Sequence, residues 1–324
     1  MLREEIIEHL GDDWKLLNKY ISDALKTDIY LLQAVNEDII SHSGKMLRPI
    51  VSILSARMIN DGVATDESIK VAASIELLHN ATLLHDDVAD ESPTRRGLPT
   101  LRSRLGPSSA VLVGDFWLAR AMELSLSSSK RSGMAKIYSK AMTNLAEGEM
   151  LQLQKAWGDG TNRDDYFRII YCKTASLFET ACKGVALVND ADEEVISALG
   201  DFAVFLGIAF QIKDDILDYI GDDSLGKPVG IDLKEQKVTL PLLCCFDDKE
   251  KEKIIREKIS DIHNHPEYCE QIRTFVLEEG GDKKAAIVLE EYVQKSLAAL
   301  EIFPKGEDRD FLEKIAKYNV IRNV

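Results

Sequence analysis

The sequence predicts an all-α protein. Apolar residues recur at the helical spacing i, i+3 and i+4, whereas the alternation typical of strands is nearly absent. Only eight prolines occur, and none lies between Pro107 and Pro228. Because an internal proline breaks a helix, this stretch favours long helices. No Ser/Gly-rich linker or low-complexity tract divides the chain, so we expect a single helical bundle over residues 1–324.

Clusters of glycine, proline and asparagine separate the expected helices, because these residues favour turns. The breaks lie at residues 41–44, 60–62, 92–99, 106–107, 158–160, 189–192, 221–230 and 280–281. The segments between them mostly have the length of one helix, about 15 to 25 residues, and the longer ones should contain further turns.

Several segments show the helical pattern directly. Residues 1–9 are charged and helix-like, and residues 202–212 form the most apolar stretch, which indicates a buried helix. Two apolar stripes with helical spacing lie within residues 107–157: Leu112, Phe116, Leu118, Ala119 and Met122, then Met142, Leu145, Ala146 and Met150. We expect both stripes to face the core.

Composition and charge exclude several classes of partner. The formal net charge of −15 argues against nucleic acid, which requires a basic surface, and disfavours anionic membranes. The five cysteines contain no CxxC pair, which fits a reducing compartment better than a disulfide scaffold. The N-terminal residues lack a secretory signal, and the apolar stretch 202–212 is shorter than the ~18–20 residues that span a bilayer. We therefore expect a cytoplasmic protein without a transmembrane segment.

Two aspartate motifs of the form DDxxD are the main clue to function. They are Asp86-Asp87-Val88-Ala89-Asp90 and Asp214-Asp215-Ile216-Leu217-Asp218. On a helix, positions i, i+1 and i+4 fall within about 100° of arc, so each motif gathers its carboxylates on one side. Six carboxylates facing one cavity would repel each other without divalent cations, and Mg²⁺ prefers a few carboxylates together with water and phosphate oxygens. A metal-bound polyphosphate is the implied ligand.

Basic and polar residues accompany both motifs. Arg95 and Arg96 follow the first motif, and guanidinium groups can hold phosphate oxygens bidentately. The others are Lys45 and Arg48 upstream, His79 before the first motif, Lys173 and Thr174 in mid-chain, Gln211 before the second motif, and Lys227 and Lys237 after it.

Taken together, these motifs resemble those of the trans-isoprenyl diphosphate synthases, also called polyprenyl synthetases, over nearly the whole chain. The stretches that carry the resemblance are GKMLRP at 44–49, LLHDDVADESPTRRG at 83–97, VGDF at 113–116, GEMLQL at 148–153, KTA at 173–175, FQIKDDILD at 210–218 and GKPVGIDLKEQKVTLP at 226–241. One DDxxD alone would be weak support, but two in this order with these basic partners are specific.

The resemblance implies an isoprenoid synthase type I fold, which is a helical bundle around a deep central cavity. It implies a Mg²⁺-dependent head-to-tail condensation of isopentenyl diphosphate with an allylic diphosphate, using about three Mg²⁺ ions per active site. It also implies a homodimer with residues 111–124 near the interface.

The resemblance further implies roles for individual residues. The metal ligands would be Asp86, Asp87, Asp90, Asp214, Asp215 and Asp218; the allylic diphosphate would be held by Arg95, Lys173, Thr174, Gln211, Lys227 and Lys237; isopentenyl diphosphate would be held by Lys45, Arg48, His79 and Arg96. Asp86, Asp87, Asp90, Lys173, Thr174, Gln211 and Asp214 would be the catalytic group.

The residues before the first motif predict a long product. In this family the growing chain is thought to run beside the helix that carries the first motif, and one helical turn rises about 5.4 Å, close to one isoprene unit. Ala81 and Thr82, where short-chain synthases carry aromatic stoppers, are small, and Leu77 and Leu78 are of moderate size. We expect about seven to ten units, with eight as the single estimate.

One departure from the family pattern concerns Gln236, which stands where the family usually has glycine. A glutamine tolerates positive φ poorly, so the conformation of this loop is open, although Lys237 is retained.

Four alternatives remain. A shorter-chain farnesyl or geranylgeranyl synthase shares all the motifs. A terpene cyclase lacks an isopentenyl diphosphate site, which Lys45, Arg48 and Arg96 argue against, and a silent regulatory subunit loses aspartates that are all present here. A di-iron carboxylate bundle needs two ExxH motifs, and the sequence has only the one formed by Glu76 and His79.

Overall fold

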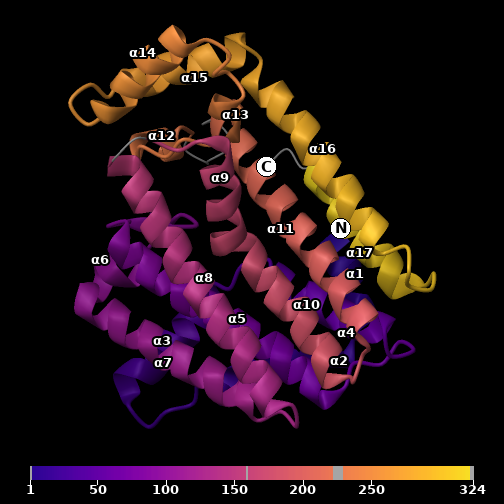
Figure 1. The fold of residues 1–324 in the computed structure, drawn as a ribbon. Helices are drawn as coiled ribbons and strands as arrows, with labels where there is room; N and C mark the ends of the chain where they lie inside the picture. The colour runs from indigo at the N-terminus through magenta and orange to yellow at the C-terminus, as the bar shows by residue number, and fades with distance from the viewer. Residues whose placement is uncertain (1, 158–159, 222–228, 322–324) are drawn as a thin grey trace. The chain divides into compact units, whose positions relative to one another are not determined.

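The structure, a computed structural model, describes residues 2–157, 160–221 and 229–321 (Figure 1). Its regular elements are almost all α-helical, which confirms the predicted class. The elements are α1 (Leu2–Leu10), α2 (Asp12–Ala24), α3 (Tyr30–Ser41), α4 (Leu47–Met58), α5 (Asp66–Ala89), β1 (Thr94–Arg95), β2 (Leu98–Pro99), α6 (Leu101–Leu105), α7 (Pro107–Leu126), α8 (Arg131–Trp157), α9 (Arg163–Ile170), the π-helix η1 (Tyr171–Ala175), α10 (Ser176–Val188), α11 (Glu193–Ile220), α12 (Ile231–Lys234), α13 (Leu240–Leu243), α14 (Lys249–Ser260), α15 (Tyr268–Glu278), α16 (Gly281–Ala299) and α17 (Glu307–Ile321).

The described chain divides into two compact units, each assembled from several segments. The first unit consists of residues 1–139, 180–200 and 303–312, and the second of residues 140–179, 201–302 and 313–324.

In the first unit, α5 is the central helix. It packs against α7, α4 and α2, and residues on all of its sides are buried. A helix that is apolar all round is suited to such a position. Its N-terminus is capped by Thr65, whose side chain accepts a hydrogen bond from the backbone N–H of Ser68. This burial fixes the helix that ends in the first aspartate motif.

A short antiparallel hairpin follows α5. Strand β1 pairs with β2 through Thr94 opposite Pro99 and Arg95 opposite Leu98. The two residues between the strands, Arg96 and Gly97, have φ angles of 53° and 78°, as a type I′ turn requires. The hairpin lies within the break expected at 92–99 and returns the chain past the end of α5.

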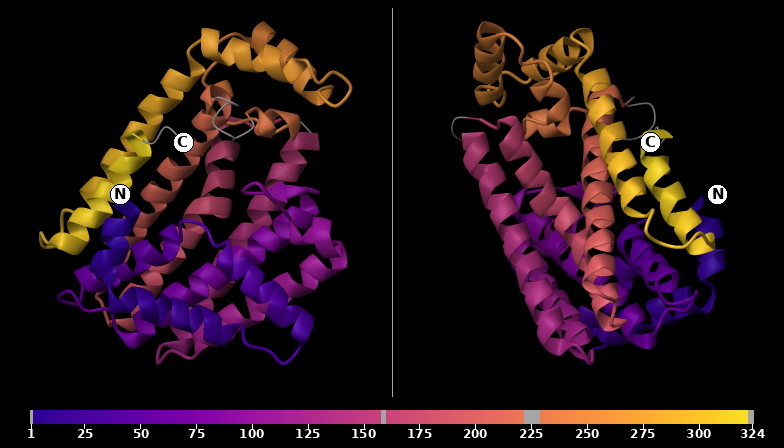
Figure 2. Two further views of the ribbon diagram at one scale, coloured as in Figure 1. Left: turned by 180° about the vertical axis from the view of Figure 1, so that it is seen from behind. Right: turned by 45° about the vertical axis from the view of Figure 1, so that its right-hand side comes forward.

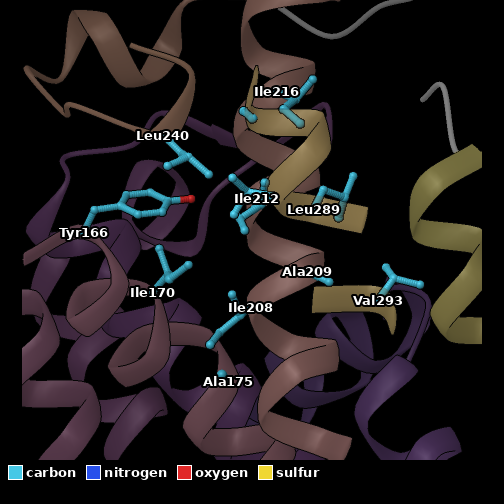
Figure 3. Close-up of a cluster of buried hydrophobic side chains, with 12 residues drawn as sticks. Tyr166, Ile170, Ala175, Ile208, Ala209, Ile212, Ile216, Leu240, Leu289 and Val293 are labelled. Carbon is cyan, nitrogen blue, oxygen red and sulfur yellow. The ribbon is translucent and has the colours of Figure 1, made fainter. Parts of the chain in front are cut away.

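In the second unit, α11 and α16 supply most of a buried apolar cluster. Figure 3 shows Ile208, Ile212 and Ile216 of α11 lying against side chains from α9, η1, α13 and α16. A separate cluster joins α14 and α15 to residues of α11, α12 and α13. The helices α14 and α15 lie in the orange region at the top of both views of Figure 2. The main cluster holds the helix that carries the second aspartate motif.

By length and composition alone, α11 is the one helix of the described residues that could cross a membrane, and half of its most apolar window is buried inside the protein. The apolar segment of α11 is therefore longer than residues 202–212, the apolar stretch identified from the sequence. Its buried side chains belong to the core clusters, which is typical of a core helix of a globular protein.

Both apolar stripes expected to face the core were assigned to the wrong side of their helices. On α7 the buried residues include Ala110, Val113 and Trp117, whereas Leu112 is 68% exposed. On α8, Tyr138 and Ala141 are buried, whereas Met150 is 65% exposed. Both helices carry apolar residues on two sides. The side that packs inward carries smaller residues or an aromatic ring with a hydrogen-bond partner, because such a side lets neighbouring helices approach more closely.

Candidate functional site

The first aspartate motif lies at the C-terminal end of α5. Asp86 and Asp87 are in the last turn, and Asp90 is the C-cap residue. Carboxylates at this end are unfavourable because the helix dipole is negative there, so nearby cations are needed. Arg95 of β1 supplies one, donating from Nε to Oδ1 of Asp87 at 2.7 Å. Burial raises the pKa of Asp87, and Arg95 opposes that rise.

A basic cluster forms around His79, one to two turns before the motif. Burial lowers the pKa of His79 well below its usual value, and the charges of Arg48, Arg96 and Arg95 lower it further. His79 is therefore neutral at pH 7 and can donate or accept a hydrogen bond without adding charge. The structure thus brings Arg48, His79 and Arg96, which the sequence assigned to one diphosphate, into a single cluster.

Gly44 explains how Arg96 is held. A Cβ at Gly44 would lie 2.5 Å from Nη2 of Arg96, so the guanidinium lies directly against the backbone of this residue. Nη1 of Arg96 also donates to the carbonyl oxygen of His42 at 3.3 Å. Lys45 is exposed beside this loop, and its carbonyl oxygen accepts from Nε of Arg3 at 3.2 Å.

Glu76 belongs to the same cluster, and sequence reasoning weighed it only as part of an ExxH motif. It is 5% exposed, and its Oε1 accepts from Nδ2 of Asn80 at 3.1 Å. Burial raises the pKa of Glu76, whereas Arg48 and the Asn80 hydrogen bond oppose the rise. A buried acid among guanidiniums balances charge and orients them.

The VGDF motif has a structural explanation in the same unit. A Cβ at Gly114 would collide with the imidazole of His85, and Oδ1 of Asp115 lies 3.3 Å from Nε2 of His85. Gly114 and Asp115 therefore hold the histidine that directly precedes Asp86.

In the second unit, the three aspartates of α11 differ in their surroundings. Asp215 is 2% exposed, whereas Asp214 and Asp218 are half-buried. Oδ2 of Asp215 accepts from the hydroxyl of Tyr166 at 2.6 Å, and Oδ1 accepts from Nε2 of Gln211 at 2.8 Å. Burial raises the pKa of Asp215 well above its usual value. The three carboxylates span about 100° around the axis of α11. Asp215 can therefore point into the core while Asp214 and Asp218 stay half-buried.

Asp218 bonds to the backbone at the start of α12. Its Oδ1 and Oδ2 accept from the backbone N–H groups of Ile231 at 3.1 Å and Asp232 at 3.2 Å, at the start of α12. Burial raises the pKa of Asp218, and these N–H groups oppose the rise.

Asp232 is an acidic residue that sequence reasoning missed. Burial and the charge of Asp218 raise its pKa to about 7, whereas Lys237 lowers it. Lys237 forms an ion pair with Glu235. The only sequence signal for Asp232 was its place in the stretch GIDLKEQK, in which attention fell on the lysines.

Lys173 and Thr174 lie in the π-helix η1. Nζ of Lys173 forms an ion pair with Glu149 and donates to Oε1 of Gln152 at 3.2 Å, both from α8. The hydroxyl of Thr174 donates to Oε1 of Gln211 at 2.8 Å. A single-turn π-helix often marks a functional site, because it redirects side chains that a regular helix would present elsewhere.

Gly148 allows this arrangement. A Cβ there would lie 2.6 Å from Cβ of Cys172, so any side chain would push η1 away from α8. Within the motif GEMLQL, Gly148 therefore lets α8 approach η1 closely, and Glu149 and Gln152 are partners of Lys173.

The other assigned residues are placed as follows. Leu77, Leu78 and Ala81 are buried in α5. Thr82 is half-buried, and its hydroxyl donates to the carbonyl oxygen of His79 at 2.8 Å. Lys227 lies outside the described residues.

The donor chemistry fits Mg²⁺. Within residues 2–157, 160–221 and 229–321, no three or more His, Cys, Asp or Glu side chains form a ready-made metal cage. Mg²⁺ is usually bound through one or two carboxylates with substrate phosphates and water rather than through a protein cage. In the first unit Asp86 and Asp90, and in the second unit Asp214, are each carboxylates of the type that binds Mg²⁺ in this way.

Comparison with known proteins gives consistent matches. The sequence model of the polyprenyl synthetase family matches residues 29–276. The chain is 36% identical to octaprenyl diphosphate synthase from Escherichia coli (strain K12), with 99% of each chain covered. Among solved structures, a decaprenyl diphosphate synthase from Rhodobacter capsulatus has a TM-score of 0.92 at 32% identity, with 99% of each chain covered. A polyprenyl synthase from Caulobacter crescentus CB15, complexed with calcium and isoprenyl diphosphate, has a TM-score of 0.91 at 34% identity, covering 99% of this chain and 98% of that one.

Proposed function

This chain belongs to the polyprenyl synthetase family, and from that membership we propose that it is a long-chain all-trans polyprenyl diphosphate synthase. It is a prenyltransferase that condenses isopentenyl diphosphate head to tail with an allylic diphosphate. The observation that carries the proposal is that both aspartate motifs are complete and each lies beside cationic or hydrogen-bonding groups suited to diphosphate.

The residues around each motif account for the chemistry. Breaking the allylic C–O bond produces an allylic cation and a highly charged diphosphate, so the leaving group needs positive partners. Arg95 and Lys173 supply charge for the allylic diphosphate, and Thr174 and Gln211 supply hydrogen bonds. Mg²⁺, when bound by the aspartates, supplies Lewis-acid stabilisation of the leaving group. About three ions per site is our proposal, since two or more phosphate groups must be neutralised.

Isopentenyl diphosphate forms no cation, so basic side chains alone can hold it. Lys45, Arg48 and Arg96 provide charge, and neutral His79 provides a hydrogen bond. Its double bond attacks the cation, a C–C bond forms, and the proton lost from the adduct passes to the released diphosphate. Apolar surroundings keep water away from the cation during this step.

We assign the product length from α5. Ala81 is 1% exposed, and neither it nor Thr82 carries a large side chain that would stop elongation at that level. A product of about eight isoprene units follows from the rise per helical turn, and the relative from Escherichia coli is an octaprenyl synthase.

The assembly and location follow from the same family membership. We propose that the two compact units act as one polyprenyl synthetase domain over residues 1–324, and that the protein is a homodimer through the outer face of α7. We also propose a cytoplasmic location, because all five cysteines are free thiols, as a reducing compartment favours.

The experiment supplies labelled isopentenyl diphosphate, farnesyl diphosphate and Mg²⁺ and sizes the product by chromatography. A dominant product of about eight units is expected. The variant Ala81→Phe should shorten the product, because its ring would obstruct the path proposed for the growing chain beside α5, whereas Ala286→Phe, at an exposed position of α16, should not. A wild-type product of only three or four units would assign a farnesyl or geranylgeranyl synthase, and a cyclised product without isopentenyl incorporation would assign a terpene cyclase.

A further inference from the structure

Four side chains of the second unit form a continuous hydrogen-bonded chain. Tyr166 donates to Oδ2 of Asp215 at 2.6 Å, and Gln211 donates to Oδ1 of Asp215 at 2.8 Å. Thr174 in turn donates to Oε1 of Gln211 at 2.8 Å. These residues come from α9, η1 and α11, so the chain of hydrogen bonds ties three elements together.

The position of Tyr166 shows that this contact is built into the core. Figure 3 shows its ring among Ile170, Ile212 and Leu240, with the hydroxyl oxygen directed toward α11. Tyr166 is 3% exposed, and a buried hydroxyl needs a hydrogen-bond partner, which Asp215 provides.

Asp215 therefore differs from Asp214, its neighbour in the motif. Each of its oxygens already accepts a hydrogen bond from a core side chain, and the residue is 2% exposed. Each oxygen keeps a second lone pair, but a metal could reach it only if Asp215 left its buried position. Asp214 is half-buried on the neighbouring side of the helix.

The chain of hydrogen bonds also sets the direction of the Gln211 amide. The NH₂ group of Gln211 donates to Asp215, and its carbonyl oxygen accepts from Thr174. The hydroxyl hydrogen of Thr174 takes part in this bond. The hydroxyl oxygen of Thr174 and the second N–H of Gln211 therefore keep a fixed orientation.

We propose that Tyr166 and Asp215 are positioning residues, which orient Gln211 and Thr174 toward the allylic diphosphate, and that Asp215 is not a metal ligand. This inference rests on the proposed function, since Gln211 and Thr174 are assigned there to the allylic diphosphate. It gives the middle aspartate of the second motif a task different from that of Asp214.

The test compares isosteric variants in the full-length protein. Asp215→Asn keeps one accepting oxygen and can bond to both neighbours, so the Mg²⁺ concentration for half-maximal activity should stay within about threefold of wild type. Asp214→Asn, which weakens a ligand, should raise that concentration by about tenfold or more. Asp215→Leu should lower kcat strongly, and its activity should be recovered by Asn at the same position.

Tyr166→Phe removes only the phenol oxygen. It should lower kcat about tenfold without changing the Mg²⁺ dependence, because the diphosphate-binding groups are misaligned while the metal ligands are intact. Tyr20→Phe is the matched control, since the Tyr20 hydroxyl also donates to a carboxylate, Oδ1 of Asp66, in the first unit and outside this chain of hydrogen bonds. Its kcat should stay near wild type.

Calorimetry provides a readout that does not need turnover. Inorganic pyrophosphate is titrated into each variant at several Mg²⁺ concentrations; Asp215→Asn should keep the wild-type Mg²⁺ dependence of binding, and Asp214→Asn should lose it. An Asp215→Asn variant that follows Asp214→Asn, or a Tyr166→Phe variant that matches Tyr20→Phe, would overturn the inference. A wild type that binds Mg²⁺ and pyrophosphate but extends no prenyl chain would instead refute the proposed function.

Discussion

At the scale of one residue, Gln236 shows how a side chain can compensate for an unfavourable backbone. Its φ is 57°, a left-handed conformation that costs a non-glycine residue about 1–2 kcal/mol. Its side-chain amide donates to the carbonyl oxygens of Ile259 at 3.0 Å and Ser260 at 3.2 Å. These carbonyls lie at the C-terminal end of α14 and have no partner within the helix. The loop thus keeps the left-handed geometry for which glycine is the usual choice.

Replacing Gln236 separates these two effects. Gln236→Ala loses both hydrogen bonds and keeps the strain, whereas Gln236→Gly loses the bonds but relieves the strain. We expect the alanine variant to be less stable than the glycine variant by about 1 kcal/mol in urea unfolding. The control is Gln294, exposed in the middle of α16, where alanine should be the more stable of the two by about 1 kcal/mol. The same order at both positions would contradict this account.

At the scale of elements, η1 is held between two helices that approach it through glycines. Gly148 of α8 faces Cys172, and a Cβ at Gly207 of α11 would lie 2.5 Å from Cα of Ala175. The backbone of η1 cannot move aside on either face without displacing Lys173 and Thr174. Two glycines in separate helices therefore fix the position of one catalytic turn.

The variant Gly207→Ala should test this arrangement. Because the clash is with backbone, we expect a loss of about 1–3 kcal/mol in the free energy of unfolding, together with a lower kcat. Gly306→Ala is the control, since a Cβ at Gly306 meets nothing within 4 Å and no positive φ is required there. Urea unfolding and steady-state kinetics measure the two effects, and a Gly207→Ala enzyme with wild-type stability would rule out the close approach.

At the scale of the whole molecule, the apolar stripe of α7 that faces away from the core indicates a contact surface. Val111 is 38% exposed and Leu112 is 68% exposed, on the side of α7 that the core does not use. Exposed apolar side chains on one helix face favour a partner surface. We propose a second copy of this chain as the occupant of this surface.

The homodimer is tested by light scattering coupled to size exclusion. The wild type should elute with twice the mass of one chain, and Leu112→Glu should shift the population toward monomer because it buries a charge at the interface. Ile287→Glu, at a similarly exposed residue of α16, should leave the dimer intact. A monomeric wild type, or equal behaviour of both variants, would refute this assembly.

The sequence predicted those site residues that lie in short motifs along the chain. The aspartates were assigned from their spacing along the chain, and Arg95, Lys173 and Gln211 from motifs that resemble those of the family. The partners of these residues were not found, since Tyr166 lies 49 positions from Asp215 and Glu149 was one of many acids. Such contacts depend on which helices pack together, and no local pattern encodes that.

The sequence by itself determined the all-α class, the family and the chemistry, because helical periodicity and charged motifs are properties of neighbouring residues. Only the tertiary structure decided which face of α7 is buried, that His79 lies among guanidiniums, and that Asp215 bonds to core side chains rather than sharing the surroundings of Asp214. The physical reason is that burial and hydrogen-bond pairing arise between elements, where an apolar or acidic residue has several possible neighbours and packing selects one.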